Sequence, residues 1–282
     1  MTLAETYRGM DRDALGTAYD NRAIVPGWQD ALADWRVRSD ALYAARRPLR
    51  DLRYGPGARQ RIDLFEAPAP DAPTVLFMHG GYWQWNDKEG QAFVAEGLLA
   101  HGLSVAIGEH TLAPAAGMAE ICAEPAEMVA RLRALLASRG RRADAIVVCG
   151  ISSGAHLMAC ALGAPGVRGA VLISGTYDLE PIRLSPLNDA IGMDAATARR
   201  CSPLHARHED VGEVLLTHGS LERPELVRQA ADFHEALTAR GHRATLAPVA
   251  GADHFSVLET LAAADGVLAR ATAALARRAS AA

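Results

Sequence analysis

A short apolar run, Ala-Ile-Val-Val-Cys at residues 145–149, leads directly into the pentapeptide Gly-Ile-Ser-Ser-Gly at residues 150–154. Together with the helical pattern that follows, this run predicts a strand, a sharp turn and a helix. In that context a G-x-S-x-G match indicates a nucleophile elbow, a strained turn that exposes the hydroxyl of its central serine. The flanking glycines are needed because a Cβ at either position would collide with neighbouring backbone. Ser152 is therefore the candidate nucleophile, whereas Ser153 is off-centre in the motif.

The same order of strand pattern and helix pattern recurs along most of the chain. Strands are predicted at residues 61–66, 74–78, 104–107, 145–149, 170–173, 213–217 and 243–248. Helices are predicted at residues 92–100, 124–138, 155–162, 225–240 and 257–276, and Pro125 suits the first turn of the second. Strands separated by helices of this length indicate parallel βαβ units. The expected fold class is α/β, a mostly parallel central sheet with helices on both faces.

The length of 282 residues fits one large α/β domain, residues 1–282. Residues 1–50 form a polar helical segment, and its Trp28, Leu32 and Trp35 fall on one helix face that is expected to pack on the domain. Residues 176–210 are irregular over a length far beyond that of ordinary connections. We interpret them as a lid or insertion over the active site, with a docked structural excursion as the alternative.

Charge and hydropathy exclude several classes of partner. The chain has 29 Lys plus Arg against 33 Asp plus Glu, and its arginines are scattered, so neither nucleic acid nor a membrane surface is an expected partner. Residues 1–12 lack the apolar stretch of a signal peptide, and no run of about 18 apolar residues occurs in the sequence. The expected location is the cytoplasm.

The cysteines and a histidine pair give no sequence signal for a metal or a cofactor. Cys122, Cys149, Cys160 and Cys201 contain no C-x-x-C pair, so reduced thiols are expected. His205 and His208 have H-x-x-H spacing, but no third ligand follows at the spacing of a metal site. We expect this pair to be solvated surface, and we expect neither a metal nor a cofactor.

The sequence His-Gly-Gly-Tyr-Trp at residues 79–83 follows another apolar run and predicts an oxyanion hole. Backbone N–H groups held in a cleft can stabilise the charge of a tetrahedral intermediate, and glycines let that backbone approach closely. The predicted donors are Gly80, Gly81 and the N–H of Ser153. His79 precedes the glycines at the strand end, and we interpret it as a residue that orients the loop.

Chain order selects the base and the acid, because in this architecture the nucleophile is followed by the acid and then by a histidine near the C-terminus. Of ten histidines, His254 fits best, since it lies in the turn between the last strand and the last helix. Glu222 is the first carboxylate after the strand at residues 213–217 and would accept the other ring N–H of His254. Its rival Glu225 follows Pro224, so it is expected in the first turn of a helix.

Several segments, in order, resemble the kynurenine formamidase (arylformamidase) branch of the α/β-hydrolases. They are Tyr19-Asp20-Asn21-Arg22 before Val25-Pro26, His79 to Trp83, Gly150 to Leu157, Ile173 to Pro181, Cys201-Ser202-Pro203, Glu222 to Gln229 and Asp253-His254-Phe255. The resemblance implies hydrolysis of N-formylkynurenine to kynurenine and formate by Ser152, Glu222 and His254, without a metal and often as a homodimer. Two departures stand out. Ile151-Ser152-Ser153 stands where the family commonly has histidine, serine and alanine, and Glu222 stands where some members have aspartate.

The implied substrate is a small aromatic molecule, and the sequence offers aromatic side chains beside the predicted oxyanion hole. Tyr82 and Trp83, with Trp85 close behind, would stack on the departing aniline. The alternative is that these rings belong to the core, since tryptophan is highly buried on average. Two other functions stay open: a carboxylesterase for small aryl or acyl esters with the same three residues, and a non-catalytic binding module, which only fold analogy supports.

Overall fold

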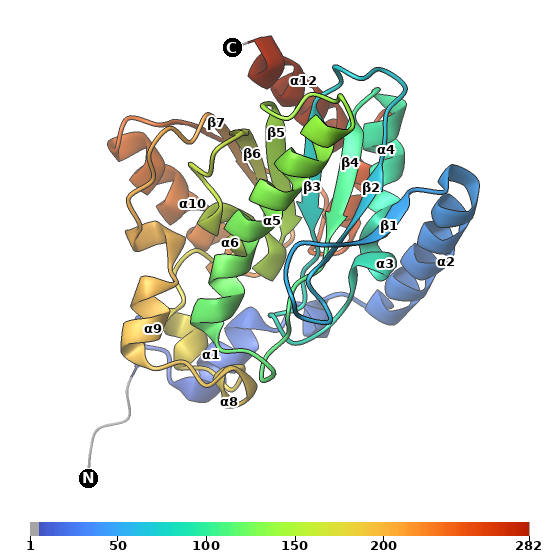
Figure 1. The fold of residues 1–282 in the computed structure, drawn as a ribbon. Coiled ribbons are helices and arrows are strands. Elements are labelled where there is room, and N and C mark those ends of the chain that lie inside the picture. The colour runs from blue at the N-terminus through green and yellow to red at the C-terminus, as the bar shows by residue number, and fades with distance from the viewer. Residues whose placement is uncertain (1–5, 282) are drawn as a thin grey trace.

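The structure is a computed structural model that describes residues 6–281, so the first five residues of the predicted N-terminal segment lie outside the described range. Eight strands form one sheet in the order β1-β2-β4-β3-β5-β6-β7-β8. They are β1 Leu49–Arg53, β2 Arg61–Phe65, β3 Thr74–Met78, β4 Ser104–Gly108, β5 Ile146–Ile151, β6 Val167–Ile173, β7 Glu213–Thr217 and β8 Arg243–Leu246. Strand β2 runs antiparallel to β1 and β4, and all other pairs are parallel. The predicted α/β fold class is confirmed (Figure 1).

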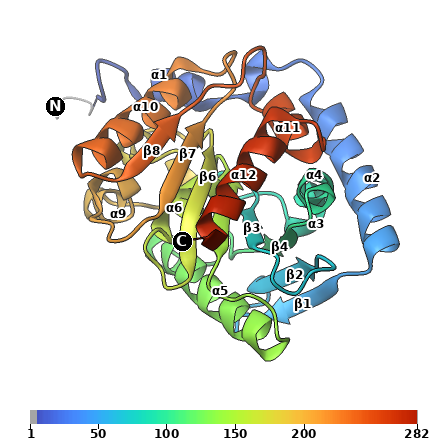
Figure 2. The ribbon, with the colours of Figure 1, turned by 90° about the horizontal axis from the view of Figure 1, so that it is seen from above.

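The helices cover both faces of this sheet, and none of those described is both long and apolar enough to cross a membrane. They are α1 Arg12–Tyr19, α2 Trp28–Arg46, α3 Lys88–Gln91, α4 Ala95–Ala100, α5 Met118–Ser138, α6 Ser153–Cys160, α7 Glu180–Arg183, α8 Asn188–Ile191, α9 Ala195–Arg200, α10 Pro224–Ala239, α11 Glu259–Ala262 and α12 Val267–Ala281. Single turns of 3-10 helix occur at Arg22–Ile24, Ala92–Val94, Pro203–His205 and Ser256–Leu258. Figure 2 shows α5 on one side of the sheet and α4 and α12 on the other.

The alternation of side chains along the central strands divides the core into two layers. Leu76 and Met78 of β3 join the cluster under α5, α6 and α10, whereas Val75 and Phe77 join the cluster under α2, α4 and α12. Successive side chains of a strand point to opposite faces, so a strand that is buried on both sides must be apolar throughout. All five residues of β3 are buried, which explains why these strands appear as short uninterrupted apolar runs.

The strand positions agree closely with the sequence prediction, but two helices differ from it. Helix α5 begins six residues earlier than predicted, so Pro125 lies inside it rather than in its first turn. Proline in a helix interior costs roughly 3 kcal/mol. Burial of Met118 and Ile121 in the first two turns offsets that cost, and the carboxylate of Glu120 accepts the N–H of Gly117 at the helix start.

The predicted final helix over residues 257–276 is also interrupted. Helix α11 ends at Ala262, the chain becomes extended at Ala263, and α12 begins at Val267. The break needs Gly266, because a Cβ there would lie 2.1 Å from the carbonyl oxygen of Thr260. Strand β1 was not predicted, since its buried and exposed positions do not alternate regularly.

The N-terminal helices pack over the same end of the sheet as the predicted site. Trp35 of α2 stacks on Phe93 with ring centroids 5.0 Å apart, and Trp28 stacks on Phe255 at 6.2 Å. Leu32 packs against the same cluster. The three residues therefore share one face of α2, as their spacing predicts.

Candidate active site

Ser152 lies in the turn between β5 and α6, with φ 56° and ψ −124°. This backbone conformation is rare for a residue with a side chain, and it is the strain expected of a nucleophile elbow. A Cβ on Gly150 would lie 2.6 Å from the carbonyl group of Gly154, and one on Gly154 would lie 2.3 Å from the carbonyl oxygens of Met78 and His79. Both glycines are therefore required by the close passage of neighbouring backbone.

The loops after β7 and β8 are joined by backbone hydrogen bonds, and this brings Glu222 to His254. Leu221 donates its N–H to the carbonyl of Ala252, and Gly219 lies so close to that carbonyl that a Cβ would stand 2.3 Å from its oxygen. Nδ1 of His254 lies 3.1 Å from Oε2 of Glu222. His254 and Ser152 line the same cavity, although within residues 6–281 no hydrogen bond joins their side chains.

Glu222 is buried and held as an anion. Its Oε1 accepts hydrogen bonds from the hydroxyl of Ser174 at 2.5 Å and the N–H of Gly219 at 2.8 Å. Burial raises the pKa of Glu222, but the charge of His254 and the hydrogen bonds from His254, Ser174 and Gly219 outweigh it and lower the pKa below its usual value. The carboxylate is thus prepared to orient the imidazole and to stabilise its charged form.

Glu225, the rival acid, lies in the first turn of α10, where the sequence places it. Its carboxylate pairs with Arg228 at 2.7 Å and accepts the hydroxyl of Tyr19 at 3.2 Å. The Glu225 carboxylate thus contacts residues of α10 and α1, whereas the Glu222 carboxylate contacts His254. Ser174, which supports Glu222, was not predicted as a site residue. The signals for it are its position directly after the strand β6 and its place in the segment from Ile173 to Pro181 that carries the family resemblance.

The loop after β3 presents the predicted oxyanion donors beside the elbow. The N–H of Gly80 contacts the side-chain oxygen of Gln91 at 3.4 Å, whereas those of Gly81 and Ser153 donate to no protein acceptor among residues 6–281. Gly81 has φ 129°, and a Cβ on it would lie 2.4 Å from the carbonyl oxygen of Trp85. His79 is buried and bonded through Nε2 to Glu109 at 2.8 Å, a position from which it anchors this loop.

A cavity of about 340 Å³ opens over Ser152 and His254. Tyr82 and Trp85 line it, and the hydroxyl of Tyr82 donates to the carbonyl of Tyr19 at 2.6 Å. Trp83 does not line it. The Trp83 side chain is fully buried and packs edge-on against His156, with ring centroids 4.9 Å apart. The prediction of Trp83 as a substrate-binding residue is therefore corrected: it belongs to the core.

The N-terminal segment supplies the opposite wall of the cavity, which the sequence did not reveal. The lining residues from this segment are Gly16, Tyr19, Asp20, Asn21, Arg22, Trp28, Leu32 and Trp35. The side chain of Asn21 is buried, and neither its amide nitrogen nor its oxygen has a hydrogen-bond partner. The signal that could have found this wall is the Tyr19-Asp20-Asn21-Arg22 sequence, which carries polar groups ahead of the helix with Trp28, Leu32 and Trp35 on one face.

The irregular stretch 176–210 folds into the three short helices α7, α8 and α9. Tyr177, Leu179 and Ile182 anchor it in the core, and Pro186 and Leu187 line the cavity. The stretch therefore covers part of the site, and its motion as a lid stays a prediction.

Comparison with known proteins places these features in a family. The family BD-FAE matches residues 62–168. The chain is 30% identical over 227 residues to the kynurenine formamidase of Salmo salar, and the match covers 74% of this chain and 75% of that enzyme. The kynurenine formamidase of Danio rerio is 28% identical over 228 residues, 76% of each chain. A crystal structure from Silicibacter sp., described as a candidate thioesterase, has a TM-score of 0.81 and 30% identity and covers 91% of this chain and 97% of its own. The chain belongs to the kynurenine formamidase family of α/β-hydrolases.

Proposed function

We propose that this hydrolase cleaves N-formylkynurenine to kynurenine and formate, with Ser152 as nucleophile, His254 as base and acid, and Glu222 as the residue that orients His254. The bonded pair of His254 and Glu222 beside the strained serine supports this assignment. The family relationship supports the choice of a formamide substrate.

The chemistry follows from these groups. His254 takes the proton of the Ser152 hydroxyl while its oxygen attacks the formyl carbon, and the N–H groups of Gly81 and Ser153 receive the oxyanion. The C–N bond then breaks as the protonated His254 gives its proton to the aniline nitrogen, because an aniline leaves poorly as an anion. His254 then takes a proton from water as the water oxygen attacks the formyl ester, and it returns that proton to the serine oxygen as the ester bond breaks. Formic acid leaves and ionises to formate.

The wall around Arg22 is the observation that favours a kynurenine substrate. The guanidinium of Arg22 lies 4.7 Å from the ring centroid of Trp85 and 5.4 Å from that of Trp28. Within residues 6–281 no carboxylate pairs with this guanidinium, so its charge is available at the cavity. A substrate with an aromatic ring and an α-carboxylate would use both features, with its ring between the aromatic walls and its carboxylate on Arg22. The buried amide of Asn21 offers further donors and an acceptor nearby.

Replacing Arg22 with glutamine should separate substrates by charge. A lost hydrogen bond to a charged group costs about 1.5–3 kcal/mol, so kcat/KM for N-formylkynurenine should fall by roughly 10- to 100-fold. Steady-state kinetics with p-nitrophenyl acetate, which has no carboxylate, should be unchanged. Arg46→Gln, at an exposed position in the last turn of α2, is the matched control. Equal losses on both substrates would assign Arg22 to the structure of the cavity.

A carboxylesterase for small aryl or acyl esters is the second candidate. It would use the same three residues. The likeness to the structure described as a candidate thioesterase, which covers 97% of that chain, supports this alternative. Only the preference for the acyl and leaving groups distinguishes the two.

A further inference from the structure

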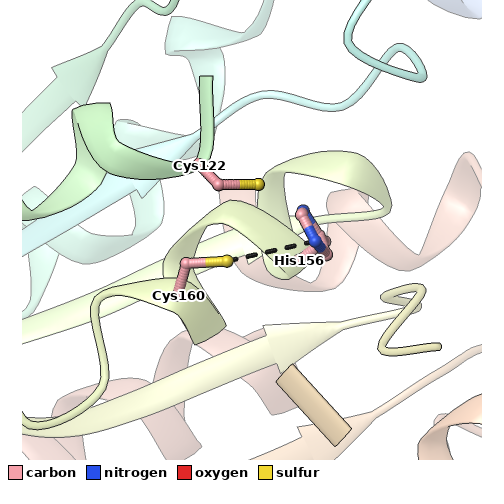
Figure 3. A group of neighbouring side chains, drawn as sticks. All are labelled: Cys122, His156 and Cys160. Carbon is pink, nitrogen blue, oxygen red and sulfur yellow. Dashed lines mark hydrogen bonds between the residues drawn. The ribbon is translucent and has the colours of Figure 1, made fainter. Parts of the chain in front are cut away.

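A cluster of sulfur and imidazole groups lies between α5 and α6, the helix that begins at the nucleophile elbow. None of its residues lines the catalytic cavity. Cys122 of α5 and His156 and Cys160 of α6 place one ligand atom each within 4.8 Å of one another. Figure 3 shows the three side chains converging from the two helices. His156 and Cys160 are four residues apart, so one helix face presents both. The sequence signal of this cluster is therefore an i, i+4 spacing of His156 and Cys160 and not a C-x-x-C pair.

The ring of His156 is held by one hydrogen bond and keeps one nitrogen without a partner. It is fully buried, and its Nε2 lies 2.8 Å from the carbonyl oxygen of Cys201, which can only accept a hydrogen bond. Nε2 therefore carries the proton, and Nδ1 carries a lone pair that has no hydrogen-bond partner. Histidines that bind metals commonly donate their other N–H to a backbone carbonyl in this way. Nδ1 is therefore the ring nitrogen left free to bind an ion.

The sulfur atoms supply the softer ligands. Cys160 Sγ lies 3.9 Å from Nε2 of His156. Cysteine binds metals as the thiolate, so occupancy of this cluster would release the thiol protons.

We propose that Cys122, His156 and Cys160 form a binding site for a thiophilic metal ion, with Zn²⁺ as the expected occupant. Sulfur and imidazole ligands suit Zn²⁺, and two cysteines with one histidine leave the fourth tetrahedral position to water. Sulfur ligands 2.3 Å from zinc lie about 3.8 Å apart, so closing the cluster needs side-chain movements of about 1 Å. Cys122 and Cys160 are each partly exposed, which provides a path for entry.

Such an ion would tie α5 to the helix that begins at the elbow. His156 also packs against Trp83, which follows the oxyanion glycines. The expected effect of occupancy is therefore a higher melting temperature, because a ligand that binds only the folded state stabilises it. This inference does not rest on the proposed function, and its test does not use activity.

The test is metal binding by the full chain after reduction and removal of metal with a chelator. Titration with Zn²⁺ against a chromophoric chelator should give one tight site per chain, and Co²⁺ as a probe should give thiolate-to-cobalt charge-transfer absorption. Cys122→Ser and Cys160→Ser should each weaken binding by more than the roughly 10- to 100-fold expected for loss of an outer-shell partner. Each variant keeps one thiolate of the pair, so its charge-transfer absorption should be weaker than that of the unmodified chain.

Two controls make the result specific. Cys149→Ala removes a fully buried cysteine on the opposite face of the sheet and should bind as the original chain does. The double variant His205→Gln, His208→Gln removes the H-x-x-H pair and should also bind normally. If a cysteine variant fails to fold, a second measurement uses the unmodified chain. Zn²⁺ should then protect Cys122 and Cys160 from alkylation, as measured by mass spectrometry. Absence of tight binding, or binding that only the histidine double variant abolishes, would overturn the proposal.

Discussion

Ser152→Ala should lower kcat by a factor of about 10⁴ or more, because it removes the atom that forms the covalent intermediate. The fold should survive, since alanine introduces no atom that serine lacks. Single-turnover and steady-state kinetics with N-formylkynurenine, together with circular dichroism, provide the measurement.

Ser153→Ala is the matched control for the nucleophile. The Ser153 hydroxyl is buried without a hydrogen-bond partner, and its proposed contribution is the backbone N–H, which alanine retains. Its kcat should therefore stay within about tenfold of that of the unmodified chain, because the oxyanion donor is intact. A loss at Ser153 equal to that at Ser152, or labelling of Ser153 by a serine-directed phosphonate, would contradict the assignment.

Glu222→Gln should lower kcat by roughly 10³- to 10⁴-fold with little change in the melting temperature. An amide in place of the carboxylate can present an N–H to His254 and favour the wrong tautomer, and it cannot stabilise the imidazolium. The effect should appear with both formamide and ester substrates, because both need the same base. Kinetics with the two substrates would check this expectation.

Glu225→Gln is the matched control for the acid. It weakens the pair with Arg228 and the bond from Tyr19, so it should reduce the free energy of unfolding by roughly 1 to 3 kcal/mol while leaving kcat unchanged. The reverse ranking of the two variants in kcat would transfer the proposed role to Glu225.

The elbow and the strands could be predicted because their signals are local. Apolar runs such as residues 74–78 reflect burial on both faces of a sheet, and the glycines at 150 and 154 reflect backbone that passes within van der Waals distance. The helix start at Met118 could not be predicted in the same way. There the burial of Met118 and Ile121 in the tertiary structure overrides the local preference of Pro125.

The aromatic residues that follow the oxyanion glycines show a different limit of prediction from sequence. Tyr82 and Trp83 have φ values of 49° and 58°, and Gly81 has φ 129°, so the chain after the oxyanion glycines follows no periodic rule. This turn buries Trp83 and leaves Trp85 at the cavity, an outcome that sequence spacing does not encode. The wall formed by Asn21, Arg22 and Trp28 depends on packing between segments far apart in the sequence. The sulfur cluster likewise joins α5 and α6, so only half of it appears as a local pattern.

The ratio of kcat/KM for N-formylkynurenine to that for p-nitrophenyl acetate tests the central claim most directly. The proposed function predicts a ratio well above one, and a sharp fall in rate when the formyl group of the substrate is lengthened to butyryl. Such a fall would show a cramped acyl site beside an aromatic leaving-group wall. A preference for butyryl esters, with N-formylkynurenine barely turned over, would contradict the claim and identify the protein as a carboxylesterase that uses the same three residues.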